Sequence, residues 1–104
     1  MQPTRIDFST LAWEEPHPGM RHRCVVRGGR KLRLLDIAPD FIEADWCRKA
    51  HIGYVLEGEL ELVLPTQTVR YAAGDGFFVL GGEAEGHKAK ALTPRVRLIL
   101  VEDA

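Results

Sequence analysis

Four side chains able to bind a metal stand out in this sequence. Asp45, Cys47 and His51 are close neighbours, and His87 follows near the other end of the chain. Residues two apart in a β-strand point to the same face, so the first three share one parity. One oxygen, one sulfur and two imidazole nitrogens suit Zn²⁺ or Fe²⁺, also accommodate Ni or Cu, and do not suit Mg²⁺ or Ca²⁺.

The composition of this donor set decides what a bound metal could do. Four protein ligands on zinc form a closed, structural site. If Asp45 stays outside the shell, Cys47 and the two histidines leave one open position, which is the arrangement that catalysis needs. Metal binding would also deprotonate the Cys47 thiol.

The same residues can be explained without a metal. Cys47 can be a small buried hydrophobic residue, and His51 and His87 can be hydrogen-bonded residues of a pocket. Asp45 stands at the expected start of a strand, where aspartate commonly makes a local turn bond. The sequence leaves a metal site and a metal-free pocket open as alternatives.

Other candidates surround the cluster. Trp46 and Tyr54 could form the wall of a pocket mouth, although aromatic residues of a small barrel commonly belong to its core. His22 could extend a polar pocket lining, or could simply be packed or exposed. Glu85 becomes a substitute ligand if its loop folds inward, and is otherwise a solvated loop charge.

Short segments separated by turn residues predict an all-β fold. The expected strands are residues 21–27, 31–37, 50–56, 59–64, 67–71, 77–80, 87–91 and 95–101. Gly28-Gly29 is typical of a hairpin turn, and no segment has apolar residues at the helical period. Strands of this length with regular turns indicate a sandwich or barrel.

Residues 1–20 differ from the rest of the chain. They hold three prolines among apolar residues, which breaks any long element. We expect an N-terminal arm over residues 1–20, lying on the barrel or on a neighbouring subunit, and a barrel domain over residues 21–104.

Size and charge limit the classes of function. A chain of 104 residues supports one core. The net charge of −1 and the absence of a basic stripe argue against nucleic acid and membrane partners, and the basic residues 21–33 are expected to form a solvated face. Without an apolar run of about 18 residues or a signal region, we expect a cytoplasmic protein with reduced cysteines.

Residues 45–87 resemble a small single-domain cupin, a double-stranded β-helix of the jelly-roll class. The resemblance is carried by Tyr-Val-Leu-Glu-Gly-Glu-Leu-Glu-Leu over residues 54–62, followed by Ala-Gly-Asp-Gly over residues 73–76. In the first cupin motif, counting back from Gly58 places His51 at the usual glutamate. Asp45 and Cys47 then stand at the two usual histidines.

The second cupin motif is also altered. Counting from Gly74, Glu85 occupies the position of the usual histidine, His87 arrives two residues late, and the usual asparagine is missing. The resemblance therefore implies the fold and an interior site, with every usual metal ligand replaced by another residue.

The resemblance implies two classes of function. One is a metal-dependent enzyme acting on a small organic molecule, such as an oxygenase or isomerase. The other is a metal-free module that senses or carries a small-molecule ligand. Small cupins commonly pair, so the resemblance also implies a homodimer, and a third alternative is a structural subunit whose barrel is only a dimerisation platform.

Overall fold

The structure is a computed structural model that describes residues 4–104. A short 3₁₀ helix at Phe8–Thr10 precedes nine strands. The strands are β1 (Glu14–His17), β2 (Met20–Arg27), β3 (Arg30–Ile37), β4 (His51–Glu57), β5 (Glu59–Val63), β6 (Thr68–Ala72), β7 (Gly76–Val79), β8 (Lys88–Ala91) and β9 (Val96–Asp103). The expected all-β fold is confirmed, and each predicted strand lies within two residues of an observed one.

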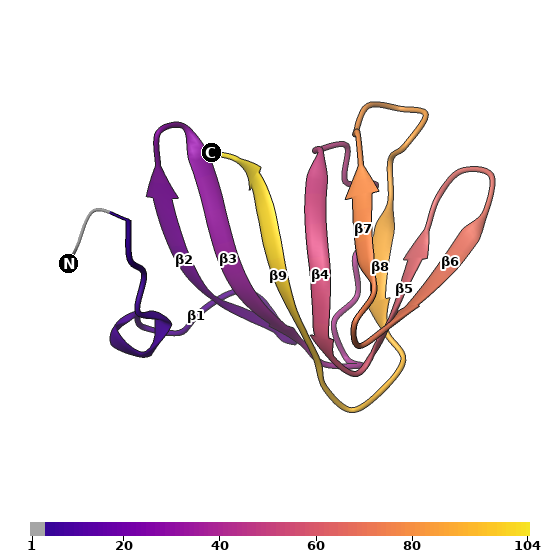
Figure 1. Ribbon diagram of the computed structural model, residues 1–104. Helices are drawn as coiled ribbons and strands as arrows, with labels where there is room; N and C mark the ends of the chain where they lie inside the picture. The colour runs from indigo at the N-terminus through magenta and orange to yellow at the C-terminus, as the bar shows by residue number, and fades with distance from the viewer. Residues whose placement is uncertain (1–3) are drawn as a thin grey trace.

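The strands form two antiparallel sheets (Figure 1). The larger sheet has the order β1-β2-β3-β9-β4-β7 and the smaller has the order β6-β5-β8. The larger sheet mixes strands from both ends of the chain, since β9 pairs with both β3 and β4. The expected arm is partly a strand, because β1 pairs with β2 at the edge of this sheet.

The glycine pair after β2 makes a tight hairpin. Gly28 has φ +57° and Gly29 has φ +75°, and Arg27 lies directly opposite Arg30. A two-residue turn of type I′, whose twist matches that of its strands, needs positive φ at both positions, which glycine adopts without steric cost. The turn fixes the register of β2 on β3 and therefore decides which side chains point inward.

The core lies between the inner faces of the two sheets. Its buried side chains come from both sheets and from the 38–50 segment: Leu35, Ile37, Phe41, Val55, Leu60, Leu62, Phe77, Val79, Ala91, Val96, Leu98 and Leu100. Gly53 faces this core because the Phe77 ring fills its place, and a Cβ there would lie 2.2 Å from a ring carbon. Alternation along β4 continues to His51, which therefore points inward as well.

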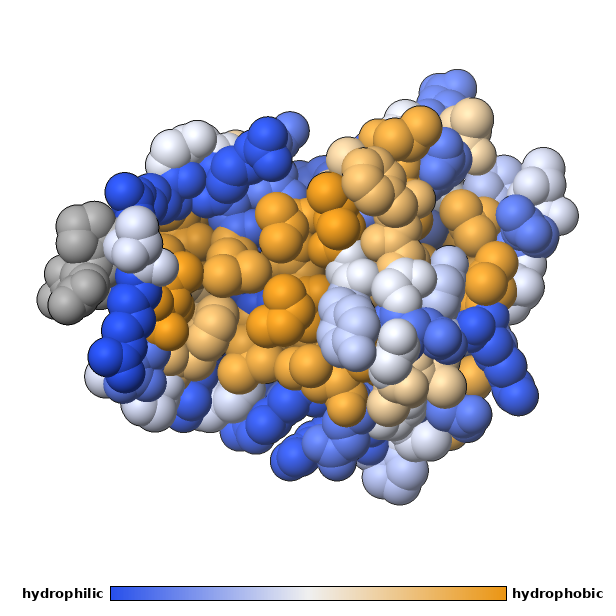
Figure 2. Space-filling model, viewed as in Figure 1, coloured by the Kyte–Doolittle hydropathy of each residue, from blue (hydrophilic) through white to orange (hydrophobic). Residues whose placement is uncertain are grey.

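The outer face of the larger sheet is also largely apolar. Figure 2 shows apolar side chains gathered over the middle of this face. Among its most exposed members are Ile52, Tyr54 and Phe78, whose exposed fractions are 41%, 49% and 67%. No helix within residues 4–104 is long and apolar enough to cross a membrane.

A buried charge cluster marks one border of that outer face. The Asp36 carboxylate accepts two hydrogen bonds from Arg97, at 2.7 and 2.9 Å, and one from Arg21 at 3.1 Å. Burial raises the pKa of Asp36, but the hydrogen bonds and charges of Arg97 and Arg21 outweigh it and hold the pKa below 3.8. The ionised carboxylate therefore stabilises the fold at neutral pH.

Asp36→Asn is expected to lower the free energy of unfolding at pH 7 by about 2–3 kcal/mol, because it leaves two arginines without their charged partner. The folded pKa lies below the unfolded value, so this contribution is complete above about pH 4 and disappears as the pH falls through the folded pKa. Urea unfolding at pH 7 and pH 3 measures it.

Glu57→Gln is the matched control for Asp36→Asn. Glu57 pairs with Arg95 at 2.9 Å, and both side chains are about half exposed. We expect a loss below about 1 kcal/mol at either pH. Equal losses in the two variants, or an Asp36→Asn effect that grows at low pH, would contradict this account.

Candidate metal centre and ligand cavity

Three of the four predicted ligands come together between the two sheets. Cys47 lies in the segment that connects β3 to β4, His51 is the first residue of β4, and His87 directly precedes β8. Cys47 and His87 form an isolated antiparallel bridge, with the Cys47 N–H donating to the His87 carbonyl at 2.9 Å and the reverse bond at 3.0 Å. This bridge fixes the two side chains beside each other although forty residues separate them in the chain.

Candidate ligand atoms of Cys47, His51 and His87 all lie within 4.8 Å of one another. His51 Nδ1 is 3.0 Å from His87 Nε2, and Cys47 Sγ is 4.0 Å from His51 Nε2. Two nitrogens bound to one tetrahedral Zn²⁺ at 2.0–2.1 Å would be about 3.3 Å apart. Widening the gap between His51 Nδ1 and His87 Nε2 by a few tenths of an ångström would therefore let both nitrogens bind one metal, with the Cys47 sulfur as the third candidate ligand.

Hydrogen bonds to the outer nitrogens of the two rings determine their tautomers. His87 Nδ1 is 3.2 Å from the Glu85 carbonyl, which only accepts, so this nitrogen carries the proton. His51 Nε2 is 2.7 Å from Glu102 Oε2. Burial raises the pKa of Glu102, but the hydrogen bond with His51 and the charges of Arg33 and Lys31 lower it to about 2. The ionised carboxylate accepts, so Nε2 carries the His51 proton.

These tautomers direct two nitrogen lone pairs at each other across 3.0 Å. Lone pairs at that distance repel unless a cation lies between them, either a shared proton or a metal ion. Burial lowers the pKa of His87 despite the neighbouring carbonyl, which favours its neutral form. Neutral imidazole is the form that binds a metal, so the chemistry of the site fits a thiolate-and-imidazole metal centre.

The remaining predicted site residues lie elsewhere. Asp45 is exposed at the cavity lining and is not part of the three-residue cluster. Trp46 and Tyr54 have exposed fractions of 38% and 49% and do not line the cavity, because each neighbours an inward-facing residue and points outward. The Glu85 carboxylate accepts from the Leu80 N–H at 3.1 Å and so is turned away from the cluster.

A cavity of about 560 Å³ adjoins the cluster. Its apolar wall includes Leu35, Leu98 and Leu100, and its polar lining includes the three candidate ligands, His22 and Glu102. This volume falls within the range of small-molecule sites. His22 is half-buried, as expected for a lining residue, and burial together with the Arg33 charge lowers its pKa.

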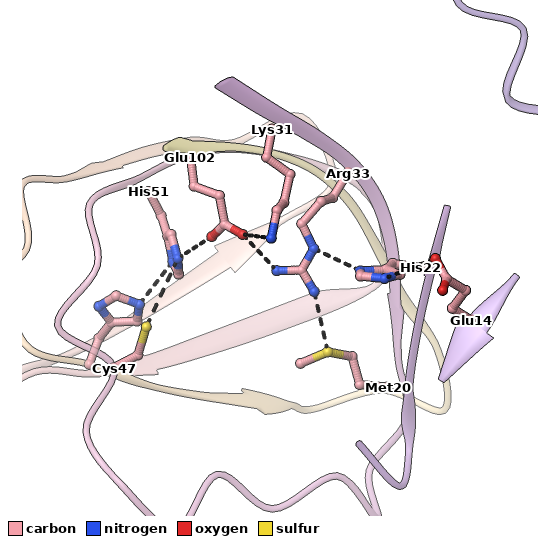
Figure 3. A network of polar contacts seen from close by, with 9 residues as sticks. Glu14, Met20, His22, Lys31, Arg33, Cys47, His51 and Glu102 are labelled. Carbon is pink, nitrogen blue, oxygen red and sulfur yellow. Dashed lines mark hydrogen bonds and ion pairs between the residues drawn. The ribbon is translucent and has the colours of Figure 1, made fainter. Parts of the chain in front are cut away.

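Among the polar residues of this cavity that sequence analysis missed, Lys31 and Arg33 both contact Glu102. Glu102 accepts from Arg33 at 3.3 Å and lies 3.8 Å from the Lys31 ammonium nitrogen (Figure 3). The last strand was expected to end at residue 101, but β9 continues to Asp103 and places Glu102 inward with Leu98 and Leu100. Lys31 and Arg33 alternate with outward residues on β3, so the expectation that all basic residues of 21–33 form a solvated face is wrong.

Comparison with known proteins identifies the fold. No family model matches the chain, and no curated protein matches it. Among solved structures, the polyketide cyclase RemF from Streptomyces resistomycificus has 25% identity and a TM-score of 0.75, over 95% of this chain and 78% of that one.

Two further structures are described as cupins. A sugar phosphate isomerase of the cupin superfamily from Silicibacter pomeroyi has 15% identity and a TM-score of 0.76, covering 96% of this chain and 75% of that chain. An RmlC-like cupin from Shewanella frigidimarina has 18% identity and a TM-score of 0.72, covering 92% and 86%. Together with the two antiparallel sheets, these matches show that the chain has a cupin-like fold.

Proposed function

We propose that this domain binds one transition metal ion through Cys47, His51 and His87, and a small organic molecule in the adjacent cavity. The observation that carries the proposal is the pair of facing nitrogens, 3.0 Å apart, whose outer N–H groups are both committed to oxygen acceptors. The thiol of Cys47 completes a donor set that suits Zn²⁺ or Fe²⁺, and also Ni or Cu.

Three protein ligands leave room in the metal shell for a molecule from the cavity. An open position is what distinguishes catalytic from structural zinc sites. The bound metal would supply a Lewis acid that polarises an oxygen of that molecule. A cyclase and an isomerase among the structural neighbours support an enzyme with a small organic substrate. The classes we propose are an isomerase, as in one of these neighbours, or an oxygenase, which the metal site would also suit.

A metal-free binding module is the second candidate. It is favoured by the loss of every usual cupin ligand and by the shared proton that could join His51 and His87 without a metal. In that case the cavity alone would hold the ligand, and the two candidates differ in metal content.

Metal analysis separates these candidates. Protein purified without added metal is expected to contain about one equivalent of zinc or iron per chain by mass spectrometry, and a chelator is expected to lower its melting temperature, because a ligand bound only to the folded state stabilises it. Less than about a tenth of an equivalent, with no thermal shift on adding Zn²⁺ or Fe²⁺, would favour the metal-free module.

We also propose that the domain forms a homodimer through the outer face of the larger sheet. Ile52, Tyr54, Phe78 and Leu80 expose between 41% and 67% of their surface on or beside this face, and monomers rarely expose a large contiguous apolar patch. The arm gives no support of its own, because Trp13 lies against Arg21 and Arg23 of the same chain, at 4.2 and 4.5 Å.

Light scattering is expected to give the mass of a dimer for the wild type and of a monomer for Phe78→Lys, because the new charge would be buried in the interface. Lys90→Glu, on the exposed side of β8 in the other sheet, serves as the control and should remain dimeric. A monomeric wild type, or a dimer that Phe78→Lys leaves intact, would contradict this assignment.

A further inference from the structure

Arg33 occupies the polar end of the cavity, beyond Glu102 as seen from the candidate metal centre. Its Nε donates to His22 Nδ1 at 2.9 Å, one terminal nitrogen to Glu102 at 3.3 Å, and the other to the Met20 sulfur at 3.6 Å (Figure 3). Only 12% of the side chain is exposed, yet the residue lines the cavity. The guanidinium is therefore largely shielded from bulk solvent but can contact a molecule bound in the cavity.

The hydrogen-bonding capacity of Arg33 is not fully used by its neighbours. Guanidinium has five N–H donors, and three of them have the partners just named among residues 4–104. One of these partners is a thioether sulfur, which is a weak acceptor. Buried charged donors normally have strong acceptors, so the other two N–H groups of the guanidinium are available to an acceptor from the cavity.

The charges around Arg33 also favour an anionic ligand. Lys31, with 27% of its side chain exposed, and Arg33 both lie beside Glu102, so two cations share a single buried carboxylate. Glu43 is a half-buried acid of the same cavity, but it lies toward the His87 end, where its carboxylate accepts the Ala89 backbone N–H at 2.7 Å and its charge acts on His87. The three charged groups in direct contact at the polar end, Lys31, Arg33 and Glu102, therefore sum to one positive charge.

We propose that Arg33, with Lys31 beside it, binds the carboxylate of a small monocarboxylic acid in this cavity. The planar guanidinium matches a carboxylate better than it matches a neutral acceptor, and such charge-assisted bonds are about twice as strong as neutral ones. One excess charge suits a monoanion. A phosphate dianion would lie beside the Glu102 carboxylate, which already contacts Arg33.

The apolar wall defines the rest of the ligand. Leu35, Leu98, Leu100 and Phe77 line the cavity between the two sheets, so an aromatic or alkyl body would pack there. The Glu102 carboxylate lies between Arg33 and His51 and contacts both of them. A small acid held by Arg33 would thus extend toward the candidate metal centre. This orientation rests on the proposed metal function, whereas carboxylate binding by Arg33 does not.

Calorimetry with matched acids and amides tests the proposal. The probes are benzoate and phenylacetate against benzamide and phenylacetamide, with inorganic phosphate as an anion of different shape. We expect at least one acid to bind wild-type protein about tenfold or more tightly than its amide, and phosphate to bind more weakly than that acid. Arg33→Gln is expected to abolish the preference, and Arg33→Lys to retain part of it.

Two controls separate this proposal from its alternatives. Arg27→Gln changes an exposed arginine of the same hairpin and should leave the preference unchanged. All titrations are repeated after metal removal by a chelator, with metal content measured for each variant and folding checked by circular dichroism. A preference that survives chelation and is lost in folded Arg33→Gln supports the proposal even if no metal binds.

Three results overturn it. One is equal affinity for acid and amide, and another is a preference that Arg33→Gln leaves intact. The third is a preference that disappears on chelation alone, since the metal and not Arg33 would then hold the carboxylate. If no acid binds at concentrations up to about 10 mM, this counts as the first result. That concentration exceeds the millimolar dissociation constants of the weakest specific sites.

Discussion

Replacing His87 or Cys47 with alanine is expected to weaken metal binding by at least about 100-fold. Apparent binding free energies of about 10–16 kcal/mol for zinc sites, divided among three or four ligands, give about 3 kcal/mol for each ligand. His87 is 3% exposed and its ring nitrogen faces His51 at 3.0 Å, so its loss removes a ligand from the centre of the cluster. Competition with a chromophoric chelator measures the change for Zn²⁺.

Asp45→Asn provides the matched control for these two replacements. Asp45 lies two residues from Cys47 and lines the same cavity, but it is exposed and outside the three-residue cluster. We expect its replacement to change the affinity by less than about threefold, as for other surface substitutions. If Asp45→Asn lost as much affinity as His87→Ala, the shell would include four protein ligands and the proposed open position would not exist.

Glu102→Gln is expected to reduce the affinity for metal by about 10–100-fold, although Glu102 is not one of the proposed ligands. A carboxylate that accepts the outer N–H of a metal-bound histidine fixes its tautomer and increases its basicity, and removing such a partner has effects of this size. The 2.7 Å bond between Glu102 Oε2 and His51 Nε2 places this carboxylate in that role. Glutamine keeps the shape and can still accept a hydrogen bond, so the loss reports the charge.

Asp103→Asn is the control for Glu102→Gln. It changes the next residue of β9, whose side chain is 87% exposed and lies 3.8 Å from Arg30. Its affinity for metal is expected to stay within about threefold of the wild type. If Glu102→Gln binds metal as tightly as the wild type, Glu102 does not position His51. The three proposed ligands would still be tested by their own replacements.

The sequence was sufficient to predict the class of fold and the strands β2 to β9, but not the edge strand β1. Apolar and polar residues alternate in residues 59–64, which is the pattern of a half-buried strand. The turn residues between segments indicated where the strands end. The same parity argument placed Cys47, His51 and His87 on inward faces. What brought them together was the bridge between Cys47 and His87, and no local pattern announces a pairing across forty residues.

The polar side of the site could not be predicted as well, for a physical reason. Glu102, Arg33 and Lys31 are charged residues on strands, and a charged residue on a strand normally marks the solvated face. Their inward placement follows from the continuation of β9 and from the register of β3 on β9, in which Lys31 lies opposite Glu102. Charge pairing across two strands stabilises an arrangement that neither strand shows alone.

X-ray absorption at the metal edge of zinc-loaded protein tests the proposed centre most directly. The account predicts one sulfur at about 2.3 Å and two imidazole nitrogens at about 2.0–2.1 Å, with the sulfur absent in Cys47→Ser. A shell of oxygen and nitrogen alone in the wild-type protein would show that Cys47 does not bind the metal, and it would contradict the account.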